Sequence, residues 1–151
     1  FRRNVSHLDI LRALSFFEVL MLVVSVLTLP VVSLLLKLRG FRKTERIMAL
    51  LSRLGMRSEA SPVRVDQAAR MVSIAAVRGP YKARCLEQAL TVWWMLGLMG
   101  IRSTIRLGIY KSGEAVEAHA WVLHEGKIVI GQMNEQKAFT PLLDVNIERQ
   151  Q

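Results

Sequence analysis

The sequence contains few of the residues that build disulfide frameworks and metal centres. Its 151 residues include one cysteine, Cys85, and three histidines, His7, His119 and His124. A single cysteine excludes an intrachain disulfide and a cysteine-based metal cluster, and it favours a reducing compartment, the cytoplasm. The sequence also has no glycine-rich phosphate loop, zinc-binding spacing or calcium loop. We therefore expect neither a metal ion nor a cofactor.

Acidic residues are scarce in the first third of the chain. Of the formal net charge of +9, residues 1–57 carry +7, from ten Lys and Arg against three Asp and Glu. Such a basic region attracts an acidic peptide, an anionic lipid or nucleic acid, or it is simply a solvated face. Nucleic acid is the least favoured of these partners, because no aromatic residues interleave with the basic ones and no helix shows a recognition-like face. We expect no nucleic-acid binding.

No charged residue interrupts residues 19–36, which read VLMLVVSVLTLPVVSLLL. A run of this length reaches that of a membrane span, and the basic residues that follow would suit a cytoplasmic membrane edge. A soluble alternative is favoured, because Pro30 lies inside the run and would divide it into two shorter buried helices. Membrane-surface contact through residues 19–36 is the second interpretation. No small-residue cleavage site follows the run, so we expect no secretory signal.

The sequence pattern changes near residue 62. A helical apolar stripe over residues 44–54 ends at Gly55, and the polar segment MRSEASP follows it as a linker. We therefore divide the chain into an N-terminal apolar and basic helical region, residues 1–61, and a second domain, residues 62–151. In this second part we expect Asp66 to cap one helix. Another helix is expected to open near Cys85, after the Gly79-Pro80 break, and to end between residues 97 and 99.

Beyond residue 103 the apolar residues alternate, which is typical of strands. We expect strands over residues 104–110, 115–123 and 127–130, with a tight turn at Glu125-Gly126 between the last two. Helices followed by strands that short turns connect predict an α+β fold with an antiparallel sheet. The tail beyond Gln132 is polar and irregular, and we expect residues 140–143 to pack back as an anchor.

Cys85 and His119 are the residues most suited to catalysis. A cysteine attacks as its thiolate, which the N-terminus of a helix favours, and Lys82 and Arg84 lie close to Cys85 in the sequence. The free N–H groups of the first helical turn would also suit an oxyanion hole. His119 lies in mid-strand between two alanines, which leave room for the imidazole. A lone cysteine or histidine is more often a packed core residue, so the residues alone leave thiol hydrolysis and a structural role equally open.

Several strings of the sequence resemble the transglutaminase-like peptidase of lasso-peptide biosynthesis, a papain-like cysteine peptidase. They are RCLEQAL at 84–90, the tryptophan pair at 93–94, LMGI at 98–101, RLGI at 106–109 and EAHAWV at 117–122. The resemblance is dense over about residues 62–132, and the N-terminal part resembles the family as an apolar helical region with a basic tail. It implies a transglutaminase-like core in which the nucleophile helix packs on a small antiparallel sheet.

This resemblance implies that Cys85 is the nucleophile and that His119 is the general base and later the acid. Such an enzyme removes the leader peptide from a ribosomally synthesised lasso-peptide precursor through an acyl-enzyme. Because the chain shows no added small β domain, the expected partners are a separate leader-recognition domain protein, the precursor leader peptide and a lasso cyclase of the asparagine-synthetase type.

One position departs from the family pattern. The family commonly has a carboxylate about a dozen residues after the histidine, where this chain reads Ile130-Gly131-Gln132. Gln132 is the candidate third catalytic residue, because its side-chain carbonyl can accept the imidazole N–H. A polar residue at the end of a strand is the equal alternative. Asp144 is a further candidate if the chain folds back.

The missing carboxylate leaves a non-catalytic class open, a transglutaminase-like scaffold, free or membrane-attached, that binds peptides without cutting them. A cross-linking transglutaminase is a third and less favoured class. Cys85 and His119 alone do not choose between water and an amine as the acceptor of the acyl group.

Overall fold

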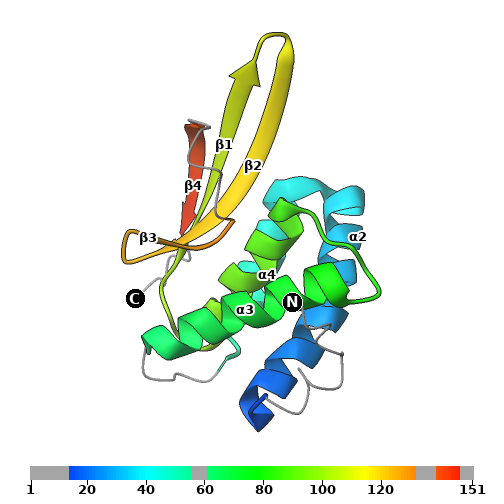
Figure 1. Ribbon diagram of the computed structural model, residues 1–151, viewed down its shortest axis with the longest axis vertical. Helices are drawn as coiled ribbons and strands as arrows, with labels where there is room; N and C mark the ends of the chain where they lie inside the picture. Colours follow the sequence, from blue (N-terminus) through cyan, green and yellow to red (C-terminus); the bar gives the residue numbers. More distant parts are fainter. Residues whose placement is uncertain (1–13, 56–60, 132–138, 147–151) are drawn as a thin grey trace, which may run out of the picture.

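The chain folds as helices followed by a small sheet, as the sequence predicts. The computed structural model describes residues 14–55, 61–131 and 139–146. In the order of the chain the elements are α2 (Phe16–Ser52), α3 (Pro62–Arg78), α4 (Cys85–Leu98), β1 (Thr104–Ser112), β2 (Ala115–His124), β3 (Lys127–Ile130) and β4 (Thr140–Asn146). Figure 1 shows the helices gathered beside a twisted sheet, with the β1–β2 hairpin extending beyond them. The predicted α+β fold is confirmed.

The predicted break at Pro30 is wrong, because α2 runs through this residue. Pro30 lies inside the helix, and the departure from helical geometry lies ten residues later at Gly40, where φ is 72° and ψ is 174°. A proline removes one backbone hydrogen bond, whereas the neighbours Leu29 and Val32 are each only 1% exposed and hold this stretch against the core. Gly40 has no Cβ and takes the positive φ without strain. The chain therefore bends at the glycine.

The helix that we expected Asp66 to cap begins earlier than predicted. α3 starts at Pro62, and Ser61 occupies the N-cap position without a side-chain hydrogen bond. Proline suits the first turn of a helix because the backbone N–H that it lacks has no partner there anyway. The start of α4 at Cys85 is as predicted.

The sheet confirms the three predicted strands and adds a fourth. In the described part of the chain the strand order is β3-β2-β1-β4, with neighbouring strands antiparallel. Glu125 and Gly126 both have positive φ, 49° and 77°, so the predicted turn between β2 and β3 is present. The segment expected only to pack back as an anchor is the strand β4, which pairs with β1.

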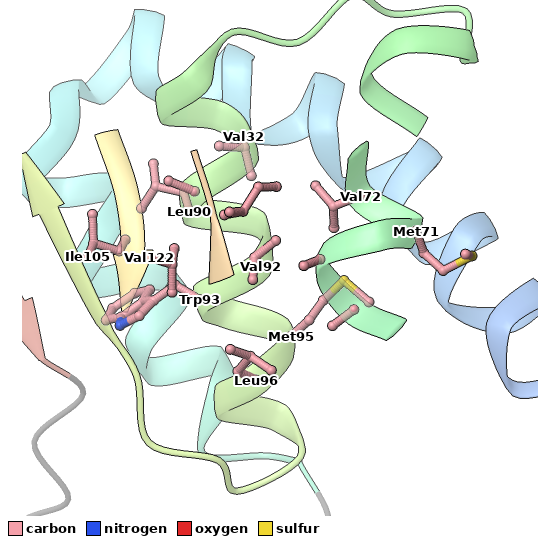
Figure 2. Packing of buried hydrophobic residues seen from close by; sticks show 14 of the residues in the cluster. Val32, Met71, Val72, Leu90, Val92, Trp93, Met95, Leu96, Ile105 and Val122 are labelled. Atoms are coloured by element: carbon pink, nitrogen blue, oxygen red, sulfur yellow. The ribbon is translucent and has the colours of Figure 1, made fainter. Parts of the chain in front are cut away.

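A single apolar core joins the helices to one face of the sheet. α4 lies at its centre, and Figure 2 shows Leu90 and Trp93 between the sheet and the other helices. The sheet contributes Ile105, Ala120 and Val122 to this core, among other residues, and α2 and α3 also contribute. The predicted division at residues 61 and 62 stays a prediction, and both parts share this core.

Candidate active site

Cys85 is the first residue of α4, where the sequence places it. The preceding Arg84 has an extended backbone, with φ −84° and ψ 169°, and acts as the N-cap. The thiol is partly buried, and Cys85 packs against the apolar core. The first-turn N–H groups of a helix have no partners within the helix, so they and the helix dipole favour negative charge at this end. The position is therefore suited to a thiolate and to a developing oxyanion.

A buried carboxylate fixes the start of α4. Glu87 is 6% exposed, and its Oε2 accepts a hydrogen bond of 2.7 Å from the backbone N–H of Arg84. The Tyr81 hydroxyl lies 2.8 Å from Glu87 Oε1 and 2.6 Å from Ser33 Oγ of α2. These contacts tie the loop before α4 to α2. Sequence reasoning missed this network, although a glutamate three residues after an N-cap is a recognisable capping signal.

A cavity of about 280 Å³ lies beside this network. Two of its lining residues, Arg84 and Leu86, flank Cys85 in the sequence, and Lys37 of α2 adds a second cationic side chain. The remaining lining residues are Ser33, Leu36, Tyr81 and Glu87. The cavity therefore adjoins the N-terminal end of the helix that carries the candidate nucleophile.

His119 lies in the middle of β2, as predicted. Its ring nitrogen Nε2 lies 3.0 Å from the carbonyl oxygen of Gly131. A carbonyl oxygen can only accept, so this contact places the imidazole proton on Nε2 and leaves Nδ1 to accept a proton. The ring also packs near Trp121 and Phe139, with centroid distances of 6.0 Å and 5.5 Å. The imidazole is thus held in one orientation.

The structure places Cys85 and His119 on elements that pack together, but it does not join the two side chains. Ala120 and Val122 of β2 belong to the core that α4 shares, whereas Trp121 does not. Because successive strand residues point to opposite faces, His119 and Trp121 lie on the face directed away from α4. Among the residues that the structure describes, no hydrogen bond links the Cys85 thiol and the imidazole. The catalytic pair therefore stays a prediction.

The two candidates for a third catalytic residue differ in what the structure shows. Gln132 lies outside the described residues. Asp144 does return to the sheet, on β4, but its two carboxylate oxygens each lie 2.7 Å from a guanidinium nitrogen of Arg106. These hydrogen bonds hold the pKa of the Asp144 carboxyl below its usual range. β1 lies between β4 and β2 in the sheet, so Asp144 is engaged with Arg106 and not with His119.

Two glycines leave room for the aromatic cluster around His119. Gly108 pairs with His119 across the β1–β2 ladder, and a Cβ there would lie 2.6 Å from the Trp121 ring. A Cβ on Gly131 would lie 2.6 Å from the carbonyl oxygen of Ala120, and this glycine has a φ of +87°. Within the described ranges, no group of three or more His, Cys, Asp or Glu side chains could hold a metal ion.

Comparison with known families identifies the architecture that carries Cys85 and His119. The model of the transglutaminase-like superfamily matches residues 28–144, a stretch that begins within α2 and includes both residues. Comparisons with curated proteins and with solved structures found no match. Because the match covers more than half of the chain, the protein belongs to the transglutaminase-like superfamily, which commonly includes cysteine peptidases and acyltransferases.

Proposed function

We propose that this protein is a cysteine peptidase that removes the leader peptide from a ribosomally synthesised lasso-peptide precursor. The observation that carries the proposal is the position of Cys85. It is the first residue of α4, next to a cavity, within the stretch that matches the transglutaminase-like superfamily. The proposed substrate rests on the sequence strings around Cys85 and His119, which resemble those of the lasso-peptide leader peptidases.

The proposed chemistry assigns two proton transfers to His119 in each half of the reaction. His119 accepts the thiol proton, and the Cys85 thiolate attacks the carbonyl carbon of the scissile peptide bond. N–H groups at the start of α4 stabilise the resulting oxyanion. The bond to nitrogen then breaks, and the imidazolium gives its proton to the leaving amine. Water, deprotonated by the same imidazole, attacks the acyl-enzyme; the bond to sulfur breaks, the imidazolium returns its proton to the Cys85 thiolate, and the leader leaves with a free C-terminal carboxyl group.

In this scheme the Gly131 carbonyl orients the imidazole, which is the role of the third residue in a catalytic triad. It lies at the point in the sequence where the family commonly has a carboxylate, and it contacts His119 Nε2. A backbone carbonyl can fix the imidazole tautomer, but it lacks the full charge that a carboxylate offers to an imidazolium. We therefore infer that Gly131 orients the ring. Gln132 keeps its role as an alternative orienting residue.

The proposed partners follow from the substrate. A separate leader-recognition domain protein presents the precursor, and a lasso cyclase of the asparagine-synthetase type closes the ring after the leader has left. The reaction takes place in the cytoplasm, where a lone thiol stays reduced.

A non-catalytic peptide-binding scaffold is the second candidate, and one observation favours it. The side chain of His119 lies on the sheet face directed away from α4, where it packs with Trp121 and Phe139. The peptidase requires this ring to reach the Cys85 thiolate in the working state. The scaffold requires no such approach.

Two experiments separate the candidates. In the first, the purified protein, the precursor and the recognition protein are mixed, and mass spectrometry follows leader release. The peptidase predicts cleavage that Cys85→Ala and His119→Ala both abolish, while undiminished cleavage by Cys85→Ala excludes that residue as the nucleophile. In the second, iodoacetamide alkylates Cys85, the only thiol in the chain. A thiolate–imidazolium pair gives a reactive component at mildly acidic pH that disappears in His119→Ala. A scaffold gives the same alkylation profile in both proteins.

A further inference from the structure

One side of α2 carries a continuous apolar stripe that the described part of the chain leaves uncovered. Its members recur at spacings of three or four residues, so they share one face of the helix. Each is between 49% and 86% exposed: Phe16, Leu20, Val23, Leu27, Val31, Leu34 and Leu38. At 1.5 Å per residue the stripe is about 33 Å long. An exposed apolar surface of this extent marks an interaction site.

The opposite side of α2 is fixed to the domain. Met21, Leu29 and Val32 are at most 4% exposed and belong to the shared core. The Ser25 hydroxyl lies 3.6 Å from the sulfur of Met95 in α4, and Tyr81 bonds to Ser33. A helix that crossed a membrane would have to break these contacts. Although α2 is long and apolar enough to span a bilayer, these contacts hold it at the surface of the domain.

The charge at the end of the stripe identifies what the surface binds. Around the bend at Gly40, four basic side chains are exposed: Lys37, Arg39, Arg42 and Lys43. No acidic residue occurs between Glu18 and Glu45. Glu18 is only 9% exposed, and its carboxylate lies 3.6 Å from Arg70 of α3. A second copy of this chain therefore offers the basic bend no acidic complement along the stripe, whereas an anionic membrane offers lipid phosphates.

We propose that α2 docks the protein on the surface of an anionic membrane. The apolar stripe enters the boundary between headgroups and acyl chains, as amphipathic helices do, and the basic bend contacts the headgroups. Lys37 belongs to this bend and also lines the cavity next to Cys85. Docking therefore brings the N-terminal end of α4 close to the lipid surface. The inference does not depend on the peptidase activity.

Vesicle flotation of the purified full chain tests the proposal. The probes are vesicles of phosphatidylcholine alone and of an equimolar mixture with phosphatidylserine. We expect binding to the mixed vesicles that salt weakens. Replacing Lys37, Arg39, Arg42 and Lys43 by Gln should weaken partitioning about fivefold per charge, and several hundredfold for all four. As a charge control, Lys111→Gln/Lys127→Gln removes two charges on the β1–β2 and β2–β3 hairpins and should retain most binding.

A second pair of variants tests the stripe. Leu27→Gln/Leu34→Gln removes apolar surface from exposed positions and should abolish flotation while the far-ultraviolet circular dichroism stays unchanged. Val77→Gln/Val116→Gln changes side chains that are equally exposed, 66% and 61%, but lie off the stripe. This control should float like the unmodified protein.

Four results would overturn the proposal. The first two are the absence of flotation with mixed vesicles and equal binding to neutral and anionic vesicles. The third is an equal loss of flotation in Leu27→Gln/Leu34→Gln and in its control, Val77→Gln/Val116→Gln. The fourth is bound protein that alkaline carbonate does not remove from the vesicles. The last result would indicate a spanning helix. Light scattering without lipid tests whether a second copy of the chain binds the stripe instead. If the protein is a dimer that Leu27→Gln/Leu34→Gln dissociates, and if it does not float with vesicles, the stripe is a dimer interface.

Discussion

Replacing Tyr81 by phenylalanine tests whether the buried network at the start of α4 holds the candidate nucleophile helix in place. The hydroxyl of Tyr81 lies 2.6 Å from Ser33 Oγ and 2.8 Å from Glu87 Oε1. A hydroxyl carries one proton and a carboxylate can only accept, so Tyr81 donates to Glu87 and accepts from Ser33. Tyr81→Phe removes both hydrogen bonds and keeps the ring.

The expected loss of stability follows from the Glu87 carboxylate, which stays buried when Tyr81 is replaced. Glu87 keeps the hydrogen bond from the Arg84 backbone but loses its Tyr81 donor, and it is too buried for water to replace that donor fully. Hydrogen bonds to charged groups contribute more than neutral ones, and we expect destabilisation by about 2 kcal/mol. Ser33 can turn its hydroxyl to a carbonyl of its own helix, as Ser25 does to Met21, so it adds little. For a chain of this size the change lowers Tm by about 4–8 °C.

Thermal unfolding monitored by circular dichroism measures this effect. Ser52→Ala is the matched control, because it removes a buried hydroxyl whose partner is a carbonyl of its own helix, Ala49, at 2.7 Å. We expect Ser52→Ala to cost less than about 1 kcal/mol. Tyr81→Phe should also cost less in a Glu87→Gln background than alone, since its charged partner is gone. If Tyr81→Phe and Ser52→Ala lower Tm equally, the network does not stabilise the start of α4.

Three further predictions concern the core, the space around Gly131 and the charged pair in the sheet. Leu90→Ala, at a position 0% exposed, should destabilise the fold by about 2–5 kcal/mol in urea unfolding, whereas Leu27→Ala on the exposed stripe should change it by less than about 0.5 kcal/mol. Gly131→Ala should cost about 2 kcal/mol or more, because its Cβ would meet the Ala120 carbonyl. Gly113→Ala, which also has positive φ but an open surrounding, should cost less in the same assay. Because folding lowers the pKa of Asp144, its pair with Arg106 stabilises the fold above the carboxyl's unfolded pKa of about 3.9 and loses this effect as pH falls through the folded value. At neutral pH, Asp144→Asn should therefore lower the free energy of unfolding by less than about 1 kcal/mol, because the pair is exposed, and should lower Tm slightly. In strong acid the substitution should leave Tm unchanged.

The sequence predicted the elements that have strong local signals. The start of α4 was predictable because Gly79-Pro80 breaks the preceding helix and Glu87 stands at the capping position. The three strands were predictable from alternation and from the turn at Glu125-Gly126. In each case the determining interactions lie within a few residues of one another.

The remaining features depend on contacts that are distant in sequence. Pro30 predicted a break, but tertiary packing of Leu29 and Val32 keeps the helix intact there, and the bend moves to Gly40. β4 was expected only as an anchor, because the segment TPLLDVN becomes a strand through its pairing with β1. The burial of Glu87 also depends on such a contact, since its second partner, Tyr81, belongs to the loop before the helix and is itself held by α2.

Which face of β2 meets α4 is the point on which the candidate site depends, and alternation alone could not predict it. The segment AHAWV places two alanines and a valine on one face and His119 and Trp121 on the other. Both faces are apolar enough to be buried, and both are: Val122 is 0% exposed and Trp121 is 4% exposed. A strand whose two faces are similarly apolar specifies its orientation weakly, and a shift by one residue would exchange the faces. In that exchange His119 and Trp121 would turn toward α4 while Val122 would leave the core. The bulk of Trp121 opposes the exchange, because the cavity that Val122 fills would have to accept an indole. The same reasoning makes Gly108 and Gly131 decisive, since side chains at either position would remove the space in which Trp121 now lies.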